Sequence, residues 1–118
     1  MSFLSMATKR KYGNTKKVID GVRFDSKAEA TRYQRLKFLQ ETGKIRDLQL
    51  QPVFILQPAF KYQGRTIQAI KYIADFQYEA DGKIVVEDVK GVQTAEFRLK
   101  MKLLLHQYPD IDFRIIDG

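Results

Sequence analysis

The chain of 118 residues contains no cysteine and a single histidine, His106. Without cysteine it can form neither a disulfide bond nor a thiolate metal site, which is compatible with a reducing compartment such as the cytoplasm. No apolar run approaches the roughly 20 residues that a membrane-spanning helix needs. The first residues lack the apolar stretch of a secretory signal. These absences predict a cytoplasmic protein with no membrane partner.

Acidic residues are also in short supply. Asp and Glu together number 14 against 21 Lys and Arg, which gives a formal net charge of +7 and a pI near 9.7. A basic surplus of this size favours a polyanionic partner, because neutralising phosphates releases counterions. Many basic proteins bind nucleic acid only incidentally, so charge alone does not decide the function.

The hydrophobic fraction of 44% is high enough for a packed core, and the length suits one domain. We expect residues 1–17 to be a flexible basic arm and residues 18–118 to form a single domain. A hairpin is predicted at 18–24, around the turn Asp20-Gly21. A helix should begin after Ser26, with Glu29 completing a capping box, and end near Thr42.

Strands dominate the centre of the chain. A weakly patterned stretch at 59–66 carries a turn at Gln63-Gly64, and a second turn is expected at Asp81-Gly82. Thr94 should cap a second helix that reaches Tyr108. Strands are predicted at 45–51, 53–56, 67–78, 83–90 and 112–116. The order of helix, strands, helix and strand predicts an α/β fold with a mixed sheet flanked by two helices.

The Asp81-Gly82 hairpin places three charged residues together. A two-residue loop sets Ala80 opposite Lys83. Continuing this register puts Asp75 directly opposite Asp88, and side-chain alternation puts Lys90 on the same face. The other face is a predicted core face that only Glu87 interrupts: Tyr72, Ala74, Phe76, Tyr78, Val85 and Val89.

Two directly opposed carboxylates repel each other. A hard divalent cation would relieve that repulsion, because Mg²⁺ typically takes one or two carboxylates together with water and substrate phosphate. Lys90 could then stabilise charge developing on a phosphate or orient the attacking water. The alternative is an exposed sheet face on which one Lys balances two solvent-facing Asp residues.

The segments Ile73-Ala74-Asp75-Phe76 and Val86-Glu87-Asp88-Val89-Lys90-Gly91 resemble the signature of the PD-(D/E)XK, or restriction-endonuclease-like, nucleases. In that superfamily an Asp on one strand and an acid-x-Lys on the next hold Mg²⁺ in an α-β-β-β-α-β core. Here Ala74 stands where the signature has Pro, and Asp88 is the acid of acid-x-Lys.

Four blocks in order are similar to a phage and prophage family, domain of unknown function 1064: 24–29, 50–52, 72–76 and 87–91. The resemblance to the nucleases implies an endonuclease that hydrolyses DNA, with branched or recombination intermediates of a phage as the substrate by analogy. Asp75, Asp88 and the Val89 carbonyl would hold Mg²⁺ or Mn²⁺, and Lys90 would assist. A phage origin would place the protein in the bacterial host cytoplasm.

Glu29 has two interpretations. Nucleases of this class often add a Glu from the first helix as a further ligand of the metal or of water, whereas the capping box explains Glu29 without chemistry. Glu87 should be a structural ion-pair partner, Gln51 a strand-end residue near the site edge, and His106 a favourable charge at a helix C-terminus.

Basic side chains of the arm and of both helices are candidate phosphate contacts: Lys9, Arg10, Lys11, Arg32, Arg35, Arg98, Lys100 and Lys102. Individually each is better explained as a solvated charge. Two other functions fit the same composition: a non-catalytic nucleic-acid-binding protein with a nuclease-like fold, and a structural or regulatory phage protein. The sequence is compatible with a homodimer and does not fix the oligomeric state.

Overall fold

The computed structural model describes residues 16–118. The predicted arm contacts Lys9, Arg10 and Lys11 lie outside the described residues. The helices are α1 (Lys27–Glu41) and α2 (Ala95–Gln107). The strands are β2 (Lys17–Ile19), β3 (Val22–Phe24), β4 (Arg46–Leu50), β5 (Val53–Gln57), β6 (Phe60–Tyr62), β7 (Arg65–Ile67), β8 (Ile70–Ile73), β9 (Phe76–Ala80), β10 (Lys83–Lys90) and β11 (Asp112–Asp117).

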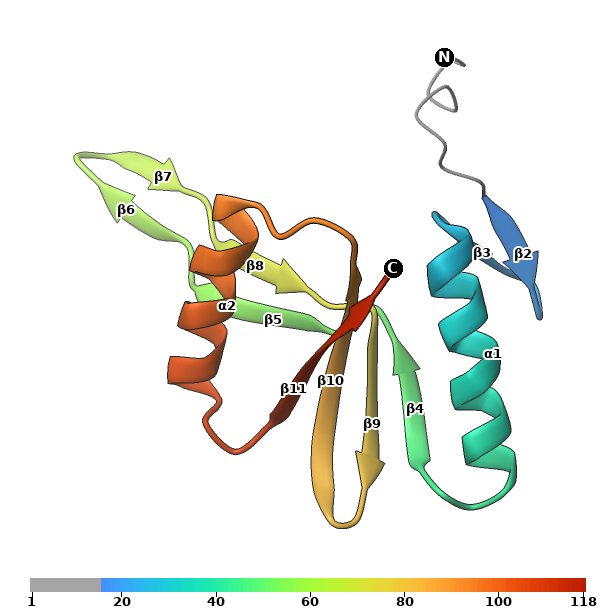
Figure 1. Ribbon diagram of the computed structural model, residues 1–118. Helices are drawn as coiled ribbons and strands as arrows, with labels where there is room; N and C mark the ends of the chain where they lie inside the picture. Colours follow the sequence, from blue (N-terminus) through green and yellow to red (C-terminus); the bar gives the residue numbers. More distant parts are fainter. Residues whose placement is uncertain (1–15) are drawn as a thin grey trace.

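A four-stranded mixed sheet lies at the centre, in the order β11-β10-β9-β4. β10 runs antiparallel to β9 and parallel to β11. The two helices lie on opposite sides of this sheet, α1 on one side and α2 on the other (Figure 1). Along the chain, this sheet and its helices follow the order α-β-β-β-α-β. The predicted α/β fold with a mixed sheet and two flanking helices is therefore confirmed.

The helix and hairpin signals of the sequence are realised. Ser26 caps α1 and Thr94 caps α2, each through a side-chain oxygen that accepts a backbone N–H 3.1 Å away. The turn residues of the β9–β10 hairpin, Asp81 and Gly82, have φ values of 53° and 79°. Asp and Gly tolerate this left-handed region better than most residues, which is why such pairs form two-residue turns.

The strand expected at 67–78 is instead divided among β7, β8 and β9. β8 pairs with β5 as a separate ribbon, and the weakly patterned stretch at 59–66 forms the β6–β7 hairpin around Gln63-Gly64. This hairpin projects from the end of the ribbon, away from the central sheet (Figure 1). Between β4 and β9 the chain thus leaves the central sheet in a long excursion that consists of β5, β6, β7 and β8.

The excursion begins at a bend in one continuous antiparallel ladder. The register that pairs Leu50 with Phe76 in β4–β9 continues without a shift into the pairing of Val53 with Ile73 in β5–β8. Two backbone hydrogen bonds bridge the gap, from Gln51 N to Asp75 O (3.0 Å) and from Ala74 N to Pro52 O (3.1 Å). Gln51 has a φ of 52°, a left-handed conformation that turns the ladder. β4–β5 and β8–β9 therefore act as two long strands that bend together.

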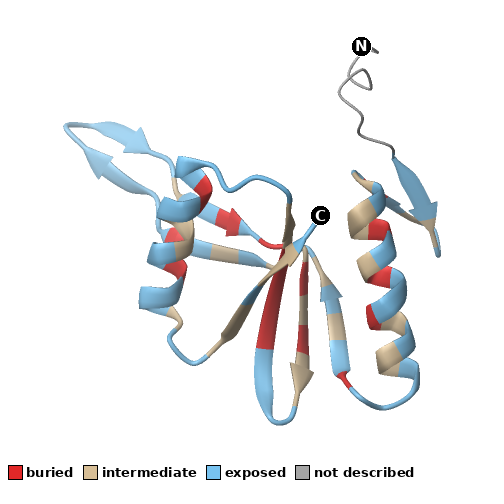
Figure 2. Cartoon of the chain, viewed as in Figure 1, coloured by how far each residue is buried: buried red, intermediate tan, exposed pale blue. Residues whose placement is uncertain are grey.

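The bend divides the core in two. One buried cluster joins α1 to the sheet through Leu36, Phe76, Tyr78 and Val85. The other joins α2 to the ribbon and to β10 through residues that include Tyr72, Ala74 and Val86. Buried residues accordingly occur on both helices and at the centre of β10 (Figure 2). The prediction of a single core face was wrong, because Tyr72 and Ala74 pack on the α2 side while Phe76 and Tyr78 pack on the α1 side.

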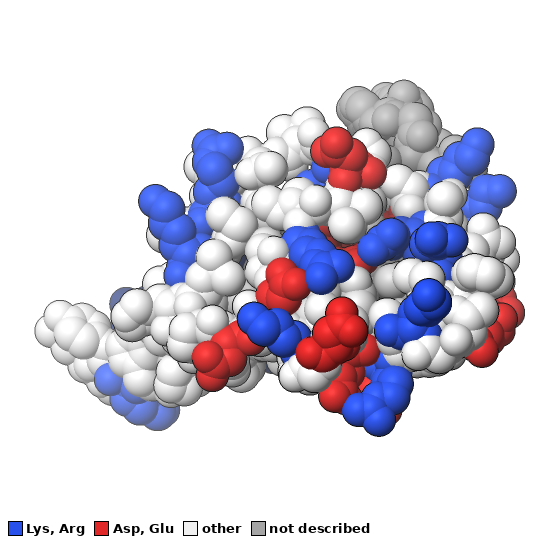
Figure 3. Space-filling view, turned by 60° about the horizontal axis from the view of Figure 1, so that its bottom comes forward, with Lys and Arg blue, Asp and Glu red and all other residues white. Residues whose placement is uncertain are grey.

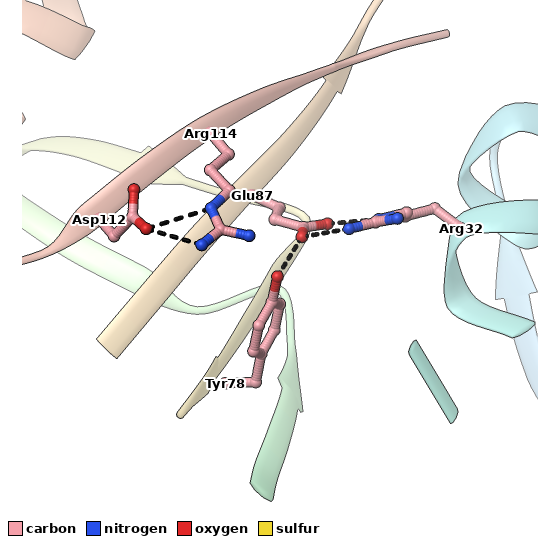
Figure 4. Close-up of polar contacts among 5 residues, drawn as sticks. All are labelled: Arg32, Tyr78, Glu87, Asp112 and Arg114. Atoms are coloured by element: carbon pink, nitrogen blue, oxygen red, sulfur yellow. Dashed lines mark hydrogen bonds and ion pairs between the residues drawn. The ribbon is translucent and has the colours of Figure 1, made fainter. Parts of the chain in front are cut away.

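Glu87 is a fully buried charge within the α1 cluster, with 0% of its side chain exposed. Arg32 from α1 donates two hydrogen bonds to its carboxylate, at 2.7 and 2.6 Å, and the Tyr78 hydroxyl donates a third. Figure 4 shows Arg32 and Tyr78 approaching Glu87 from different elements. The predicted structural ion pair is confirmed, and it ties α1 to the middle of the sheet.

Replacing Arg32 by Ala should destabilise the fold strongly. The change leaves a buried carboxylate without its cation, for which breaking a buried pair suggests a loss of about 3 kcal/mol or more in the free energy of unfolding. The matched control is Arg46→Ala, because Arg46 pairs with Glu79 at 2.9 Å with 70% of its side chain exposed and should contribute less than about 1 kcal/mol. Urea denaturation measures both, and equal losses would contradict the structural role of Arg32.

Candidate functional site

Asp75 lies at the bend, between β8 and β9. Its backbone N–H donates to Glu87 O at 3.1 Å, and its side-chain Oδ2 accepts the Val89 backbone N–H at 2.8 Å. β9 leaves β10 at this point, so the Val89 donor would otherwise lose its partner in the ladder. The Asp75 carboxylate therefore supplies the hydrogen bond that the diverging strand no longer provides.

The predicted hairpin register holds for most of its length. Pairing runs from Lys83 opposite Ala80 to Glu87 opposite Phe76, where β9 begins. The direct pairing of Asp75 with Asp88 is therefore not formed, because the strand bends one residue too early. The two side chains are nevertheless neighbours. Burial, followed by the adjacent Asp88 carboxyl group, raises the pKa of Asp75 well above its ordinary value.

Asp88 is only 3% exposed and lies on the α2 side of the sheet. The alternative of two solvent-facing Asp residues is therefore wrong. The Tyr72 hydroxyl donates a hydrogen bond to Asp88 Oδ2. Burial, and then this contact, raise the pKa of Tyr72. Alternation does not predict Tyr72 as a site residue, because it assigns the side chain to the face opposite Asp88, and the run from Ile67 to Tyr78 contains no local breaker where β8 meets β9.

Lys90 lies two residues beyond Asp88 on the same strand. Its Nζ is 4.9 Å from the centre of the Phe97 ring, a cation–π arrangement. Burial raises the pKa values of Asp75 and Glu29, and the positive charge of Lys90 offsets a small part of that rise, so the ammonium group lies in the field of both carboxyls. Within residues 16–118, Lys90 makes no ion pair within 4.0 Å. Its ammonium group is therefore free of a carboxylate partner in the described part of the chain.

Glu29 forms only half of the predicted capping box. Its backbone N–H donates to Ser26 Oγ, but the described hydrogen bonds include none from the Ser26 backbone to the Glu29 carboxylate. The side chain instead lines a cavity with Gln51 and Asp75. Burial, and then the charges of Asp75 and Asp25, raise the pKa of Glu29 to about 7. The structure thus brings Glu29 to the carboxyl pair, and the cap needs only its backbone.

Two cavities flank the carboxyl pair. One, of about 210 Å³, lies on the α1 side and is lined by residues that include Glu29, Gln51 and Asp75. The other, of about 390 Å³, lies on the α2 side. Its charged lining residues are Lys71, Asp88, Lys90, Glu96 and Lys100. The pair therefore lies between a hollow that holds the Glu29 and Asp75 carboxyls together with Arg23, and a larger one whose charged lining is three lysines and two carboxyls.

The predicted phosphate contacts on α1 have different surroundings. Arg32 is engaged with buried Glu87, whereas Arg35 is exposed and lies 5.9 Å from the centre of the Phe38 ring. Both line a groove of about 590 Å³ together with Lys27 and the end of β11. Arg35 is thus available to a ligand, while two N–H donors of Arg32 are already bound to the Glu87 carboxylate.

On α2, Lys100 lines the cavity beside Asp88 and pairs with Glu96 at 3.2 Å. Arg98 donates to the backbone of Gln93, and Lys102 is exposed. His106 is exposed in the last turn of α2, where a positive charge is favourable. Figure 3 shows Lys and Arg over much of one face of the molecule, with Asp and Glu among them. That face has no continuous basic band.

The carboxyl pair suits a divalent cation, but few other ligand side chains among the described residues surround it. Among residues 16–118, no three His, Cys, Asp or Glu side chains form a group arranged to hold a metal ion. One oxygen of each carboxylate already accepts a protein donor, which leaves one oxygen of Asp75 and one of Asp88. Two carboxylates are a usual protein contribution to a Mg²⁺ site. For Val89, the structure shows its N–H, and not its carbonyl, in contact with the pair.

A family model described as "Protein of unknown function (DUF1064)" matches residues 9–117. The chain belongs to this family. No curated protein and no solved structure matches the chain. Among the described residues, neither helix has the length and apolar character required to cross a membrane.

The blocks that carry the likeness to the family converge in space. They are far apart in the sequence, yet each contributes to the surroundings of the carboxyl pair. Phe24, Glu29, Leu50, Gln51 and Asp75 line one cavity, and Tyr72, Asp88 and Lys90 line the other. The fold thus assembles one site from four separate segments.

Glu29→Gln should change the pH dependence of stability. Because the folded-state pKa of Glu29 is about 7, against an ordinary value of 4.5, the folded protein holds this proton more tightly than the unfolded chain. Its contribution to stability is present at low pH and is lost as pH rises towards 7. We expect the variant to gain stability relative to wild type between pH 4.5 and 8, measured by urea denaturation in chelator. A curve parallel to that of wild type would exclude this environment for Glu29.

Asp88→Asn should reverse the order of stability between chelator and metal. The variant removes the buried member of two neighbouring carboxyl groups and keeps an oxygen that can accept from Tyr72. It should therefore melt at or above the wild-type temperature in chelator. A ligand at a hundredfold excess over its Kd adds about 2.7 kcal/mol to the folded state, so wild type should gain with Mg²⁺ or Mn²⁺ and the variant much less. Asp81→Asn in the β9–β10 turn is the control, and an equal metal response in both variants would remove Asp88 from any metal site.

Proposed function

We propose that the protein is a metal-dependent endonuclease that hydrolyses phosphodiester bonds in DNA, using Mg²⁺ or Mn²⁺. One observation carries the proposal. The Asp75 and Asp88 carboxyls, from different segments, meet at the bend together with the Lys90 ammonium group, beside a cavity lined by Lys71 and Lys100. This is the arrangement that the restriction-endonuclease-like resemblance implies, and the basic composition of the chain supports a nucleic-acid substrate.

The residues of the site fit the requirements of this reaction. Asp75 and Asp88 would hold the cation through their remaining oxygens. A bound divalent cation supplies charge stabilisation at the phosphate and makes water a better nucleophile. Lys90, which has no carboxylate partner among the described residues, would stabilise the negative charge that develops on the phosphate oxygens. Glu29, with a pKa of about 7, can accept a proton from water near neutral pH.

The bonds made and broken are simple. A water oxygen attacks phosphorus, one phosphorus–oxygen ester bond breaks, and the departing oxygen takes a proton to become a hydroxyl. The products are a phosphate monoester and a free hydroxyl end. The protein groups named above bind, orient and exchange protons, and none of them forms a covalent intermediate.

A second function is favoured by a different observation. Each carboxylate of the pair already has a protein donor, Val89 N–H for Asp75 and the Tyr72 hydroxyl for Asp88. Such contacts can be purely structural, in which case the protein would bind nucleic acid without cutting it. Incubation with linear, flapped and four-way DNA, with and without Mg²⁺ or Mn²⁺, separates the two. Metal-dependent cleavage supports the nuclease, and binding without cleavage supports the non-catalytic alternative.

Lys90→Met should abolish most of the cleavage and leave binding nearly unchanged. Loss of one donor that stabilises transition-state charge typically lowers kcat on the order of 100- to 1000-fold. Lys83→Met is the matched control, because Lys83 lies exposed at the opposite end of the same strand. Single-turnover cleavage measures the rate, and fluorescence anisotropy in chelator measures binding. Wild-type cleavage by Lys90→Met would remove Lys90 from the mechanism.

A further inference from the structure

The β6–β7 hairpin is exposed along both of its strands. Every residue from Phe60 to Ile67 is exposed, including two aromatic rings, Phe60 at 45% and Tyr62 at 59%. An isolated two-stranded hairpin is marginally stable in water. Large exposed aromatic side chains on such an element favour a binding role over a structural one.

The hairpin is part of a long stretch without acidic residues. Between Asp47 and Asp75 there is no Asp or Glu, whereas Lys61, Arg65 and Lys71 all lie within it. The whole excursion of β5, β6, β7 and β8 therefore carries only positive charge. Such a surface is complementary to a polyanion.

One face of the hairpin combines the aromatic rings with a guanidinium group. Tyr62 pairs across the strands with Arg65, and Phe60 pairs with Ile67. Directly paired residues and residues two apart share a face in a strand pair, so these four side chains lie together. Lys61 and its partner Thr66 occupy the other face. Aromatic rings beside an arginine are a common way to stack nucleic-acid bases.

We propose that this hairpin is a stacking platform for unpaired nucleotides of the DNA that the protein cleaves. Phe60 and Tyr62 take the bases, and Arg65 on the same face contacts the backbone. The inference deepens the proposed function, on which it rests, by naming a partly single-stranded DNA, such as a flap or junction, as the substrate class.

Unpaired nucleotides fit this surface better than a blunt duplex. Bases in a duplex are stacked on each other and offer their faces to a protein only after unstacking, which costs free energy at every step. Unpaired bases expose a π-face at once, and stacking on aromatic residues is tolerant of sequence. The charge of the excursion favours a nucleic acid over a second copy of this basic chain.

One basic residue, Lys71, lies along the chain between the hairpin and the candidate site. β8 leads directly from the hairpin to Asp75, and Lys71 on β8 lines the cavity that contains Asp88 and Lys90. From Ile67 to Asp75 an extended chain covers at most about 26 Å. A strand held on Phe60 and Tyr62 can therefore continue past Lys71 towards the carboxyl pair.

The test is binding of fluorescein-labelled DNA to the full chain in chelator, measured by anisotropy. The probes are a single strand of about 15 nucleotides, within the range that single-strand sites cover, a blunt duplex, and the same duplex with an unpaired flap. Phe60→Ala with Tyr62→Ala is the test variant. Ile84→Ala is the control, because Ile84 is a 42% exposed apolar residue on β10, outside the hairpin. Phe60→Tyr with Tyr62→Phe keeps both rings and should keep wild-type binding.

We expect the double alanine variant to bind the single strand and the flapped duplex at least about 10-fold more weakly. Stacking of one base on an aromatic ring contributes about 1–3 kcal/mol, or roughly 5- to 150-fold. Its affinity for the blunt duplex should change by less than about 2-fold. Equal binding of single strands by this variant and wild type would overturn the proposal, as would no preference of wild type for the flapped duplex.

Two further measurements keep the outcomes distinct. Sedimentation of the unbound proteins tests for a homodimer. A dimeric wild type together with a monomeric double alanine variant would overturn the proposal, because the hairpin would then be a self-association surface. Metal-dependent cleavage by wild type is measured separately. Loss of stacking in a protein that never cuts DNA would support the platform while refuting the nuclease. Metal-dependent cleavage by wild type, together with unaltered single-strand binding by the double alanine variant, would support the nuclease and refute the platform.

Discussion

The bend of the β4–β5 and β8–β9 ladder is the constraint on which the rest of the structure depends. At this point one strand pair leaves the central sheet, and its backbone hydrogen bonds must be satisfied elsewhere. The Asp75 side chain satisfies one of them by accepting the Val89 N–H. Gln51 adopts a left-handed conformation opposite it, and the ladder register continues unbroken through the turn. The bend is therefore stabilised by a specific hydrogen bond from the backbone to the Asp75 carboxylate.

The two-part core and the candidate site follow from this geometry. Because the ladder turns, the same alternating side chains pack on α1 before the bend and on α2 after it. β10 consequently has both faces buried, and the side chains of its adjacent acids, Glu87 and Asp88, point to opposite sides. Glu87 meets Arg32 on the α1 side, while Asp88 meets Tyr72 on the α2 side. Glu87 is thus paired with a cation, whereas Asp88 is paired with a neutral hydroxyl group and has the acidic Asp75 as a neighbour.

Local signals predicted the elements better than they predicted how the elements pack. Ser26, Thr94 and the Asp-Gly turns act within a few residues, so caps, hairpins and the register from Ala80 to Phe76 followed from the sequence. The proximity of Asp75, Asp88 and Lys90 also followed. The role of Tyr72 could not be predicted, because alternation assumes a straight strand. The run from Ile67 to Tyr78 gives no signal of a break, since the bend depends on long-range pairing with Gln51 and Pro52 and not on a local breaker in β8–β9.

The Asp75–Asp88 pair combines a structural role with the proposed chemical role in the same residues. If the only purpose of Asp75 were to accept the Val89 N–H, an uncharged acceptor such as Asn would serve without placing a second acid beside Asp88. The pair instead raises the pKa of Asp75, and Glu29 adds a third carboxyl to the same field. Concentrating acids in this way costs stability unless a cation or protons neutralise them. Residues that break a local rule without a structural gain are expected at functional sites. The folding energetics and the proposed chemistry therefore point to the same place, the bend between β8 and β9.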